Sequence, residues 1–193
     1  MSGLEGVMQV EHSHLILDAC CVLNLCASGN FIAILKTIPA QVVVTEVVKQ
    51  QELKTLQNLT VEDNDGAVQL EKAIQKGLLL IVDFESESEE ETFINYVFEM
   101  GDDGESATFA IASHRRWSVA TDDKKAIAFF KKEEPDLQIF SSLEIIKHWA
   151  EVTNSSSQEL KNTLSAVRVK ARYFPSQKHL LFNWWQSAMN AQD

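Results

Sequence analysis

The sequence predicts an α/β protein in which a parallel β-sheet lies between layers of α-helices, followed by a helical extension at the C-terminus. Short apolar stretches of strand length alternate with longer stretches in which apolar residues recur at helical spacing. The strand-like stretches are almost continuously apolar, which is typical of strands covered on both faces. Seven glycines and three prolines among 193 residues are too few for the frequent turns of an all-β protein.

The first half of the chain contains three of these units. Residues 15–17 form a short apolar strand, and apolar residues at helical spacing follow it. Residues 42–44 are consecutive valines, as in a buried strand, and Thr45 then begins a second helical stretch. A helix over 65–77 ends at a glycine and leads into a third apolar strand over 78–84. The order is therefore βαβαβ.

The second half continues the alternation. An acidic run at 85–91 begins a helix, and its charges are interpreted as a solvated helix N-terminus, with an electrostatic guard near a site as the alternative. Asp103 caps the next helix, and residues 117–120 form the fourth strand. Residues 137–140 form the fifth strand, after which Ser141 begins a helix with a capping-box sequence. Strands alternating with helices predict a parallel sheet.

The composition changes near Asn154, and no strand candidate follows it. We therefore predict a domain over residues 13–150 and a helical extension over 151–193. The extension is rich in aromatic residues, including Trp184 and Trp185. Because such residues seldom stand in water, we expect the extension to pack on the domain or on a partner, for example in a homodimer.

Charge and composition exclude several classes of protein. Seventeen basic and 28 acidic residues give a formal charge of −11, which excludes a basic protein that coats duplex nucleic acid. No apolar run approaches the roughly 20 residues of a membrane span, and the acidic N-terminus is unlike a secretory signal. The three cysteines are an odd number and suit a reducing compartment, and their spacing does not predict a zinc site. We therefore expect a cytoplasmic protein.

Acidic residues follow the predicted strands where they end. Asp18 comes directly after the first strand, Asp122 and Asp123 follow the fourth, and Glu105 lies at the start of a helix on the same edge. Parallel strands bring such residues to one edge, where α/β proteins bind ligands. A single aspartate there usually caps a helix. Several carboxylates together repel one another unless a cation lies between them, and such oxygen ligands suit Mg²⁺ or Mn²⁺.

Four segments, in this order, resemble the PIN-domain nucleases: LILDACCVLNLCASGNFIAIL, VVVTEVV, GDDGESATFAIAS and VATDDKKAI. The resemblance covers residues 13–150 and implies a parallel α/β/α sandwich. It further implies that acidic residues bind one or two Mg²⁺ or Mn²⁺ ions and hydrolyse phosphodiester bonds, commonly in RNA. By position, Asp18, Glu105 and Asp123 correspond to the catalytic metal ligands, with Asp122 as a further candidate ligand. Thr121 corresponds to the supporting hydroxyl before the last acid.

Two positions depart from the family pattern. Cys20 stands where the family often has Asn or Ser. Gln50 stands three positions after Val47, where the family has a glutamate, so one carboxylate is missing. On a helix that begins at Thr45, Glu46 shares a face with Gln50 and could replace that glutamate as a metal ligand. The alternative is that Glu46 only favours the helix N-terminus.

Basic residues gather in two windows. The segment 160–180 contains five cations and no acid, and it also holds Tyr173 and Phe174, whose rings suit either hydrophobic packing or base stacking. Other cations lie near the predicted site and are candidate nucleic-acid contacts: Arg115, Arg116, Lys124 and Lys125. Together the two windows allow a basic path across an acidic body, while the alternative is that they are solvated helix faces.

We predict that the protein is a metal-dependent endoribonuclease that hydrolyses phosphodiester bonds in RNA. Small PIN-domain proteins are best known as toxins of bacterial toxin–antitoxin pairs, so an antitoxin protein is a candidate partner. The alternative is a PIN-like scaffold that has lost hydrolysis and binds nucleic acid or protein, which the absence of a glutamate at Gln50 favours. Cleavage of RNA that depends on a divalent metal separates the two hypotheses.

Overall fold

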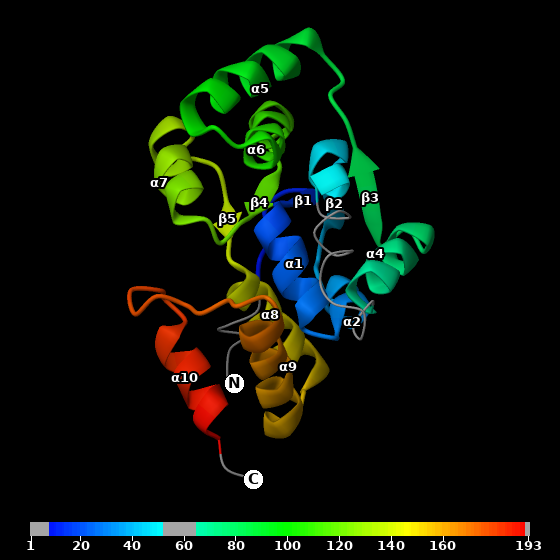
Figure 1. The fold of residues 1–193 in the computed structure, drawn as a ribbon, viewed down its shortest axis with the longest axis vertical. Helices are drawn as coiled ribbons and strands as arrows, with labels where there is room; N and C mark the ends of the chain where they lie inside the picture. The colour runs from blue at the N-terminus through cyan, green and yellow to red at the C-terminus, as the bar shows by residue number, and fades with distance from the viewer. Residues whose placement is uncertain (1–7, 52–64, 192–193) are drawn as a thin grey trace.

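The computed structural model describes residues 8–51 and 65–191, and it contains a five-stranded sheet flanked by helices (Figure 1). The strands lie in the spatial order β3-β2-β1-β4-β5, and every neighbouring pair is parallel. This confirms the predicted parallel α/β architecture. The strands are β1 (His14–Leu17), β2 (Gln41–Thr45), β3 (Leu79–Val82), β4 (Ser118–Ala120) and β5 (Ile139–Phe140).

Helices cover both faces of the sheet. The hydrophobic core on one face includes side chains of α1 (Ala19–Ala27), α2 (Phe31–Leu35), α4 (Asp65–Gln75) and α8 (Ser142–Thr153). The core on the other face includes side chains of α5 (Glu87–Met100), α6 (Asp103–Arg115) and α7 (Lys124–Glu133). Residues 46–51 are also helical.

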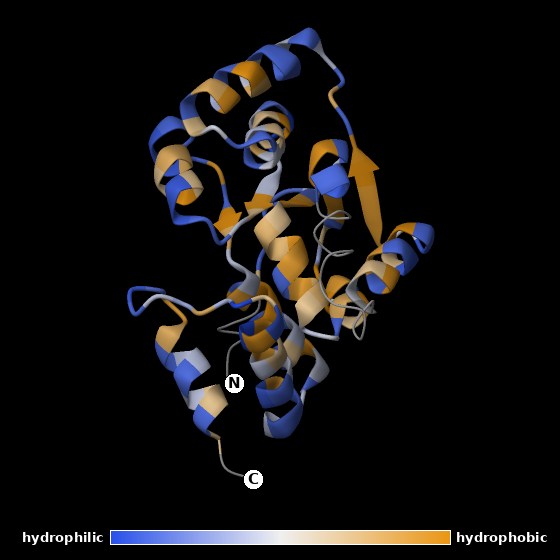
Figure 2. Cartoon of the chain, in the orientation of Figure 1, coloured by the Kyte–Doolittle hydropathy of each residue, from blue (hydrophilic) through white to orange (hydrophobic). Residues whose placement is uncertain are grey.

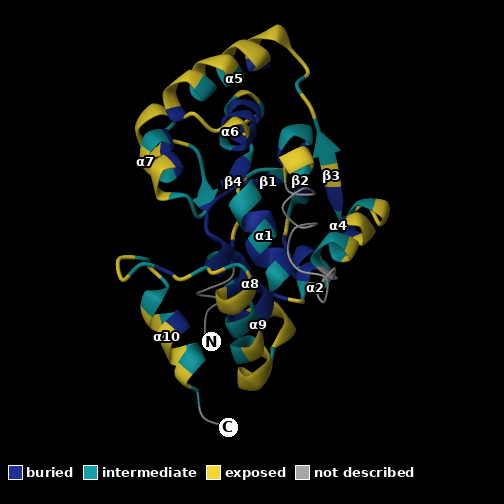
Figure 3. Ribbon diagram, in the orientation of Figure 1, coloured by how far each residue is buried: buried dark blue, intermediate teal, exposed yellow. Residues whose placement is uncertain are grey.

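The central strand shows why the sheet must be covered on both faces. Leu15 and Leu17 of β1 point into one core, whereas Ile16 points into the other, because side chains alternate along a strand. All three are fully buried. Figure 2 shows β3 and β5 among the apolar segments, and Figure 3 shows the centre of the molecule as the most buried. The apolar runs at 15–17 and 42–44 lie within β1 and β2, whereas β3 and β5 are shorter than the predicted 78–84 and 137–140.

The helical stretch after β1 is broken into α1 and α2. Gly29 lies between them with a φ of 77°, a left-handed conformation that glycine adopts without strain. Its neighbour Asn30 precedes α2 and donates from Nδ2 to Thr163 Oγ1 over 2.9 Å. This hydrogen bond connects the break to the C-terminal part of the molecule.

The C-terminal extension consists of α9 (Ser157–Lys170) and α10 (Phe182–Asn190), joined by the connection 171–181. Helix α9 packs on α1, and α10 packs on α9 (Figure 1). Leu164, Val167 and Trp185 are buried in the same core as the side chains of β1. The extension is thus continuous with the main core. Of the helices in the described residues, none is long and apolar enough to cross a membrane.

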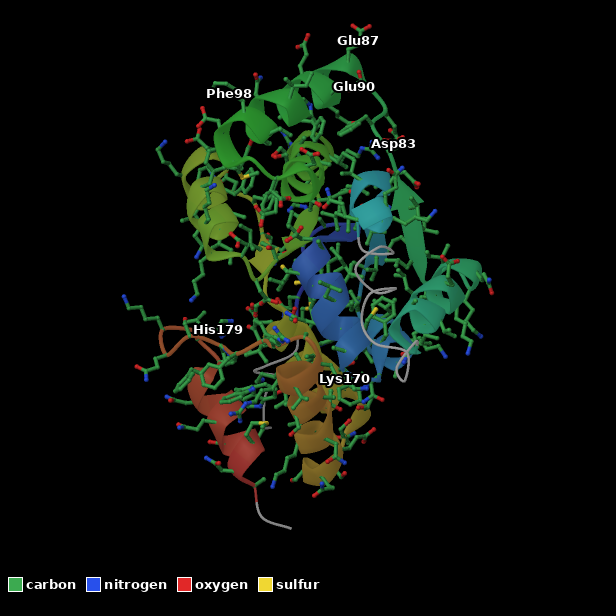
Figure 4. All side chains as sticks on the ribbon, viewed as in Figure 1. Asp83, Glu87, Glu90, Phe98, Lys170 and His179 are labelled. Carbon is green, nitrogen blue, oxygen red and sulfur yellow. The ribbon has the colours of Figure 1, made fainter. Side chains whose placement is uncertain are left out.

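The acidic run 85–91, which contains the first turn of α5, has a structural partner. Ser86 caps α5, and the buried Glu89 accepts from Arg115 Nε over 2.7 Å. Arg115 also lies 3.1 Å from a carboxylate oxygen of Glu85, so its guanidinium is bound by this run. The pairing lowers the pKa of Glu89 and raises that of Arg115. Figure 4 shows Glu87 and Glu90 of the same run pointing away from the molecule, which fits the predicted solvated helix N-terminus.

The burial of the extension predicts a measurable contribution to stability. Leu164 is 1% exposed, so Leu164→Ala should lower the free energy of unfolding by about 2–5 kcal/mol through lost burial and a residual cavity. Val169 on the same helix is 75% exposed, and Val169→Ala should change it by less than about 0.5 kcal/mol. Urea denaturation of the full chain measures both. Equal stability of the two variants would show that α9 is not part of the cooperative core.

Candidate functional site

A cavity of about 600 Å³ lies at the carboxyl ends of β1 and β4, between these strand ends and the connection 171–181. Its volume is within the range of small-ligand sites. The parallel register pairs Leu17 with Ala120, so the residues that follow both strands reach the same edge. Five carboxylates line the cavity: Asp18, Asp102, Glu105, Asp122 and Asp123. Three basic side chains line it as well: Lys124, Arg172 and His179.

Asp18 is the most buried of these acids, at 1% exposure. Its Oδ2 accepts from Cys20 Sγ over 3.1 Å and from Thr121 Oγ1 over 2.9 Å. Its Oδ1 is buried and has no hydrogen-bond partner in the described structure. Burial raises the pKa of Asp18 above its usual range. A buried oxygen without a partner is costly, and a bound cation would satisfy it.

Glu105 comes from the first turn of α6, next to the cap of that helix. Asp102 is the cap, and its Oδ1 accepts from the backbone N–H of Glu105 over 2.8 Å. Burial raises the pKa of Glu105 to about 8, and the negative charges of Asp18, Asp123 and Asp102 contribute to the rise. The carboxyl of Glu105 is therefore within electrostatic reach of the acids that follow β1 and β4.

Asp123 caps α7, since its Oδ1 accepts from the backbone N–H of Ala126 over 2.8 Å. Its own backbone N–H donates to Thr121 Oγ1 over 3.1 Å. Thr121 is thus bonded to both Asp18 and Asp123, and it fixes the two strand ends relative to each other. This geometry suits the supporting role expected for Thr121.

Asp122 is oriented differently from its neighbours. Its Oδ1 accepts from the backbone N–H of Ser142 over 3.1 Å and from the hydroxyl of Tyr173 over 3.2 Å. Its Oδ2 accepts from Asn24 Nδ2 over 2.8 Å and from the Ser142 hydroxyl. These donors belong to α1, α8 and the connection after α9. Because both oxygens are saturated, the contacts favour a structural role for Asp122 over metal binding.

A second group of ligand types lies beside the carboxylates. One ligand atom each of Cys20, Cys21 and Asp122 falls within 4.8 Å of the others, which makes a possible metal-binding group. Thiolates suit zinc better than Mg²⁺. However, burial raises the pKa of Cys21 well above its usual range, which keeps this thiol protonated. Among the described residues, Asp18, Glu105 and Asp123 do not form so compact a group.

Cys20 occupies the position where the sequence lacked an expected polar side chain. Its thiol donates to Asp18, lies 3.5 Å from Thr121 Oγ1 and accepts from the backbone N–H of Asp122 over 3.2 Å. The thiol therefore makes the positioning contacts that an amide or hydroxyl could make there. With cysteine at position 20, the Asp18 carboxylate is still held by a hydrogen bond from this side chain.

Neither Glu46 nor Gln50 lines the cavity. Glu46 pairs with Lys49 over 3.8 Å, and Gln50 is exposed. The neighbouring Gln51 lies closer to the acids, because a Cβ atom on Gly104 would come within 2.9 Å of Gln51 Oε1 and 3.5 Å of Asp102 Oδ1. Val48, and not Val47, is the buried valine of this helix. The residue three positions after the buried valine is therefore Gln51 and not Gln50.

The four cations expected to contact nucleic acid are separated in space. Lys124 lines the cavity, and Lys125 is near enough to Glu105 to lower its pKa while donating to the Met100 carbonyl over 2.7 Å. Arg115 is bound to Glu89, and Arg116 is exposed at the end of α6, away from the cavity lining. Three ionisable lining residues were not predicted as site residues: Asp102, Arg172 and His179. Asp102 precedes the predicted helix start and Arg172 belongs to the basic window 160–180, whereas His179 had no local signal.

Comparison with family models, curated proteins and solved structures gives no match for this chain. The functional interpretation therefore depends on the geometry and chemistry of the site itself.

The raised pKa of Glu105 predicts a pH-dependent stability of the metal-free protein. Its folded value of about 8 lies above the value near 4.3 of an unfolded glutamate, so the native state binds more protons between these limits. The contribution of Glu105 to the free energy of unfolding should fall as pH rises from about 4.3 to 8. Urea denaturation in EDTA should show this decline in the wild type and a weaker one in Glu105→Gln.

The exposed Asp103, two residues earlier on the same helix, is the matched control. Asp103→Asn should keep the wild-type pH dependence. If Glu105→Gln and Asp103→Asn had the same pH dependence of stability, the pKa of Glu105 would not be raised in the folded protein.

Proposed function

We propose that the protein is a metal-dependent nuclease of the PIN type that hydrolyses phosphodiester bonds in RNA. The observation that carries the proposal is the buried, unpartnered Oδ1 of Asp18 beside a cluster of mutually repelling carboxylates. A group of carboxylates alone is often a set of helix caps, as Asp102 and Asp123 are. Asp18 makes no side-chain cap to α1, although it precedes that helix. Cys20 and Thr121 hold its Oδ2, whereas its Oδ1 is left without a partner, and metal binding would supply one.

The ligand types present suit Mg²⁺ or Mn²⁺, because both ions prefer carboxylate oxygens, although in the described structure the ligand atoms of Asp18, Glu105 and Asp123 do not all lie within 4.8 Å of one another as those of a formed site would. Asp18, Glu105 and Asp123 would hold the ion, with Asp102 on the same wall. A bound ion supplies an activated water and stabilises the negative charge that develops on the phosphate. The charge balance supports a cation here, since five lining carboxylates face only three basic side chains. Without a cation, this wall would repel an RNA phosphate.

Residues around the acids have positioning roles in this proposal. Thr121 and Cys20 donate to Asp18 Oδ2, which leaves Oδ1 for the ion. Asp102 and Asp123 are held by the helix N-termini that they cap, so their carboxylates are fixed before a ligand arrives. Lys124 follows Asp123 directly and offers an ammonium group to a phosphate in the cavity.

The rival proposal is a PIN-like scaffold that binds nucleic acid or protein without hydrolysis. Gln51 favours it, because the side chain nearest Gly104 and Asp102 from this helix is an amide without charge. Glu46, the acid that could have replaced it, is directed to Lys49. A role as a toxin neutralised by an antitoxin is a further proposal, which stands on the resemblance to PIN-domain nucleases.

Metal binding should stabilise the native state by mass action. At 100 times its Kd, Mn²⁺ should raise the thermal midpoint of the wild type by about 5–10 °C. Asp18→Asn should nearly abolish the rise, because the amide brings no charge to the buried position. Asp103→Asn, an exposed position outside the cavity lining, should respond like the wild type. Differential scanning fluorimetry with and without EDTA measures this. An undiminished rise in Asp18→Asn would place the ion elsewhere, for example at Cys20 and Cys21.

Catalysis provides the direct test of the proposed function. The purified wild type should cleave single-stranded RNA with Mn²⁺ or Mg²⁺ and lose this activity in EDTA. Asp18→Asn should lower the rate at least 100-fold, a loss typical of a charge that acts on the transition state. Asp103→Asn should retain the wild-type rate. Tight RNA binding without metal-dependent cleavage by the wild type would support the scaffold proposal instead.

A further inference from the structure

The wall of the cavity that faces the acids is built by the C-terminal extension. Residues 171–176 and His179, all from the connection between α9 and α10, line it opposite the strand ends. Figure 4 shows His179 in this connection, near the start of α10. The two walls differ in charge. The strand ends contribute carboxylates, whereas the extension contributes Arg172 and His179 and no acid.

Arg172 has an unusual backbone. It follows the last residues of α9 with a φ of 54°, in the left-handed region where helices usually place glycine. Its side chain is nevertheless a cation that lines the cavity. Arg116 and Asn154, the C-caps of α6 and α8, have the same left-handed conformation, so it is a helix-end geometry. Of these three residues, only Arg172 lines the cavity.

The connection is held against the strand ends. Tyr173 donates to Asp122 Oδ1 over 3.2 Å, and Pro175 is buried. Phe174 packs on Trp185 with a ring-centroid distance of 4.8 Å, yet it remains 54% exposed at the cavity. These contacts fix the segment that carries Arg172. The wall is therefore preformed.

His179 presents a donor to the cavity. Its Nδ1 accepts from the backbone N–H of Leu181 over 3.0 Å, so in the neutral ring the proton is on Nε2. An Nε2–H group can donate to an anionic oxygen. Arg172 and His179 together offer the donors that recognise phosphates, and the exposed ring of Phe174 offers a face for base stacking.

We propose that the connection 171–179 is the RNA-binding wall of the site, and that Arg172 and His179 bind the phosphates of a single-stranded RNA while Phe174 stacks on a base. This inference rests on the proposed nuclease function. A cavity of about 600 Å³ with walls on two sides accommodates a nucleotide of a single strand but not a duplex. The strand ends then hold the scissile phosphate, and the extension holds the neighbouring nucleotides.

The test measures RNA binding without cleavage. Full-length Asp18→Asn protein is titrated in EDTA against a fluorescent single-stranded oligoribonucleotide, so that neither cleavage nor metal occupancy affects the result, and further substitutions are made in this background. Arg172→Gly removes the guanidinium and relieves the left-handed backbone, so it should fold at least as well while weakening binding about tenfold. Arg172→Lys should retain most of the affinity. His179→Asn keeps an acceptor near the position of Nδ1, removes the Nε2 donor and should also weaken binding.

Lys178→Ala is the matched control, because it removes one positive charge from the same connection at an exposed position outside the cavity lining. It should change the affinity less than twofold. The salt dependence separates direct contact from an indirect effect: the slope of log K against log salt should fall by about 0.7 in Arg172→Gly and stay unchanged in Lys178→Ala. Equal effects of the two substitutions, or preferential binding of duplex RNA, would overturn the inference.

Wild-type cleavage distinguishes failure of this inference from failure of the proposed function. If the wild type cleaves RNA and Arg172→Gly alone leaves KM unchanged, the wall has no role in binding, although the nuclease proposal stands. If the wild type does not cleave but Asp18→Asn binds single-stranded RNA through Arg172, the wall is supported and the nuclease proposal fails.

Discussion

The parallel pairing of β1 with β4 is the interaction on which the arrangement of the site depends. Leu17 is in register with Ala120, and the backbone N–H of Asp18 donates to the Ala120 carbonyl over 2.9 Å. The strands therefore end together, and the chain that leaves them must bring Asp18 beside Thr121 and Asp123. Helix starts add the remaining acids, because α6 and α7 begin at the same edge with Asp102 and Asp123 as their caps. The acids that follow the strands and cap the helices are therefore the same acids that the proposed function assigns to the cation site.

Asp122 connects this edge to the rest of the molecule. One carboxylate accepts hydrogen bonds from α1, α8 and the connection after α9, so the sheet edge, two helices and the extension share one anchor. Tyr173 is a member of this network, and burial together with the negative charge of Asp122 raises its pKa above the usual range. A buried network of this kind is sensitive to the loss of any member, because each remaining polar group keeps its desolvation cost. The position of the wall that carries Arg172 therefore depends on the same residue that ends β4.

Apart from Lys124, acidic and basic side chains lie on different walls of the cavity. Asp18 and Glu105 both have raised pKa values because burial and neighbouring carboxylates disfavour their ionised forms. A divalent cation reverses this preference, and its charge then attracts an anionic substrate. Basic side chains are confined to Lys124 and the extension wall, where they face the acids without neutralising them in contact. The separation suits a phosphodiester, which must contact a metal on one side and fixed positive charges on the other. Under the proposed function, this separation is what would let a protein of net charge −11 bind a polyanion locally.

The sequence by itself determined the parallel α/β class, the strand order along the chain and the acids at the strand ends, because hydrophobic periodicity and helix caps are local signals. Asp18, Glu105 and Asp123 could be named from such signals, and the structure brings them within electrostatic reach of one another. Only the tertiary structure decided that Asp122 faces inward, that Gln51 rather than Gln50 approaches Gly104, and that Arg115 binds Glu89. It also decided that Arg172 and His179 line the same cavity as Asp18, more than 150 residues away along the chain. The direction in which a side chain points, and the partner that it meets across the chain, depend on packing between distant elements, which no local pattern of residues encodes.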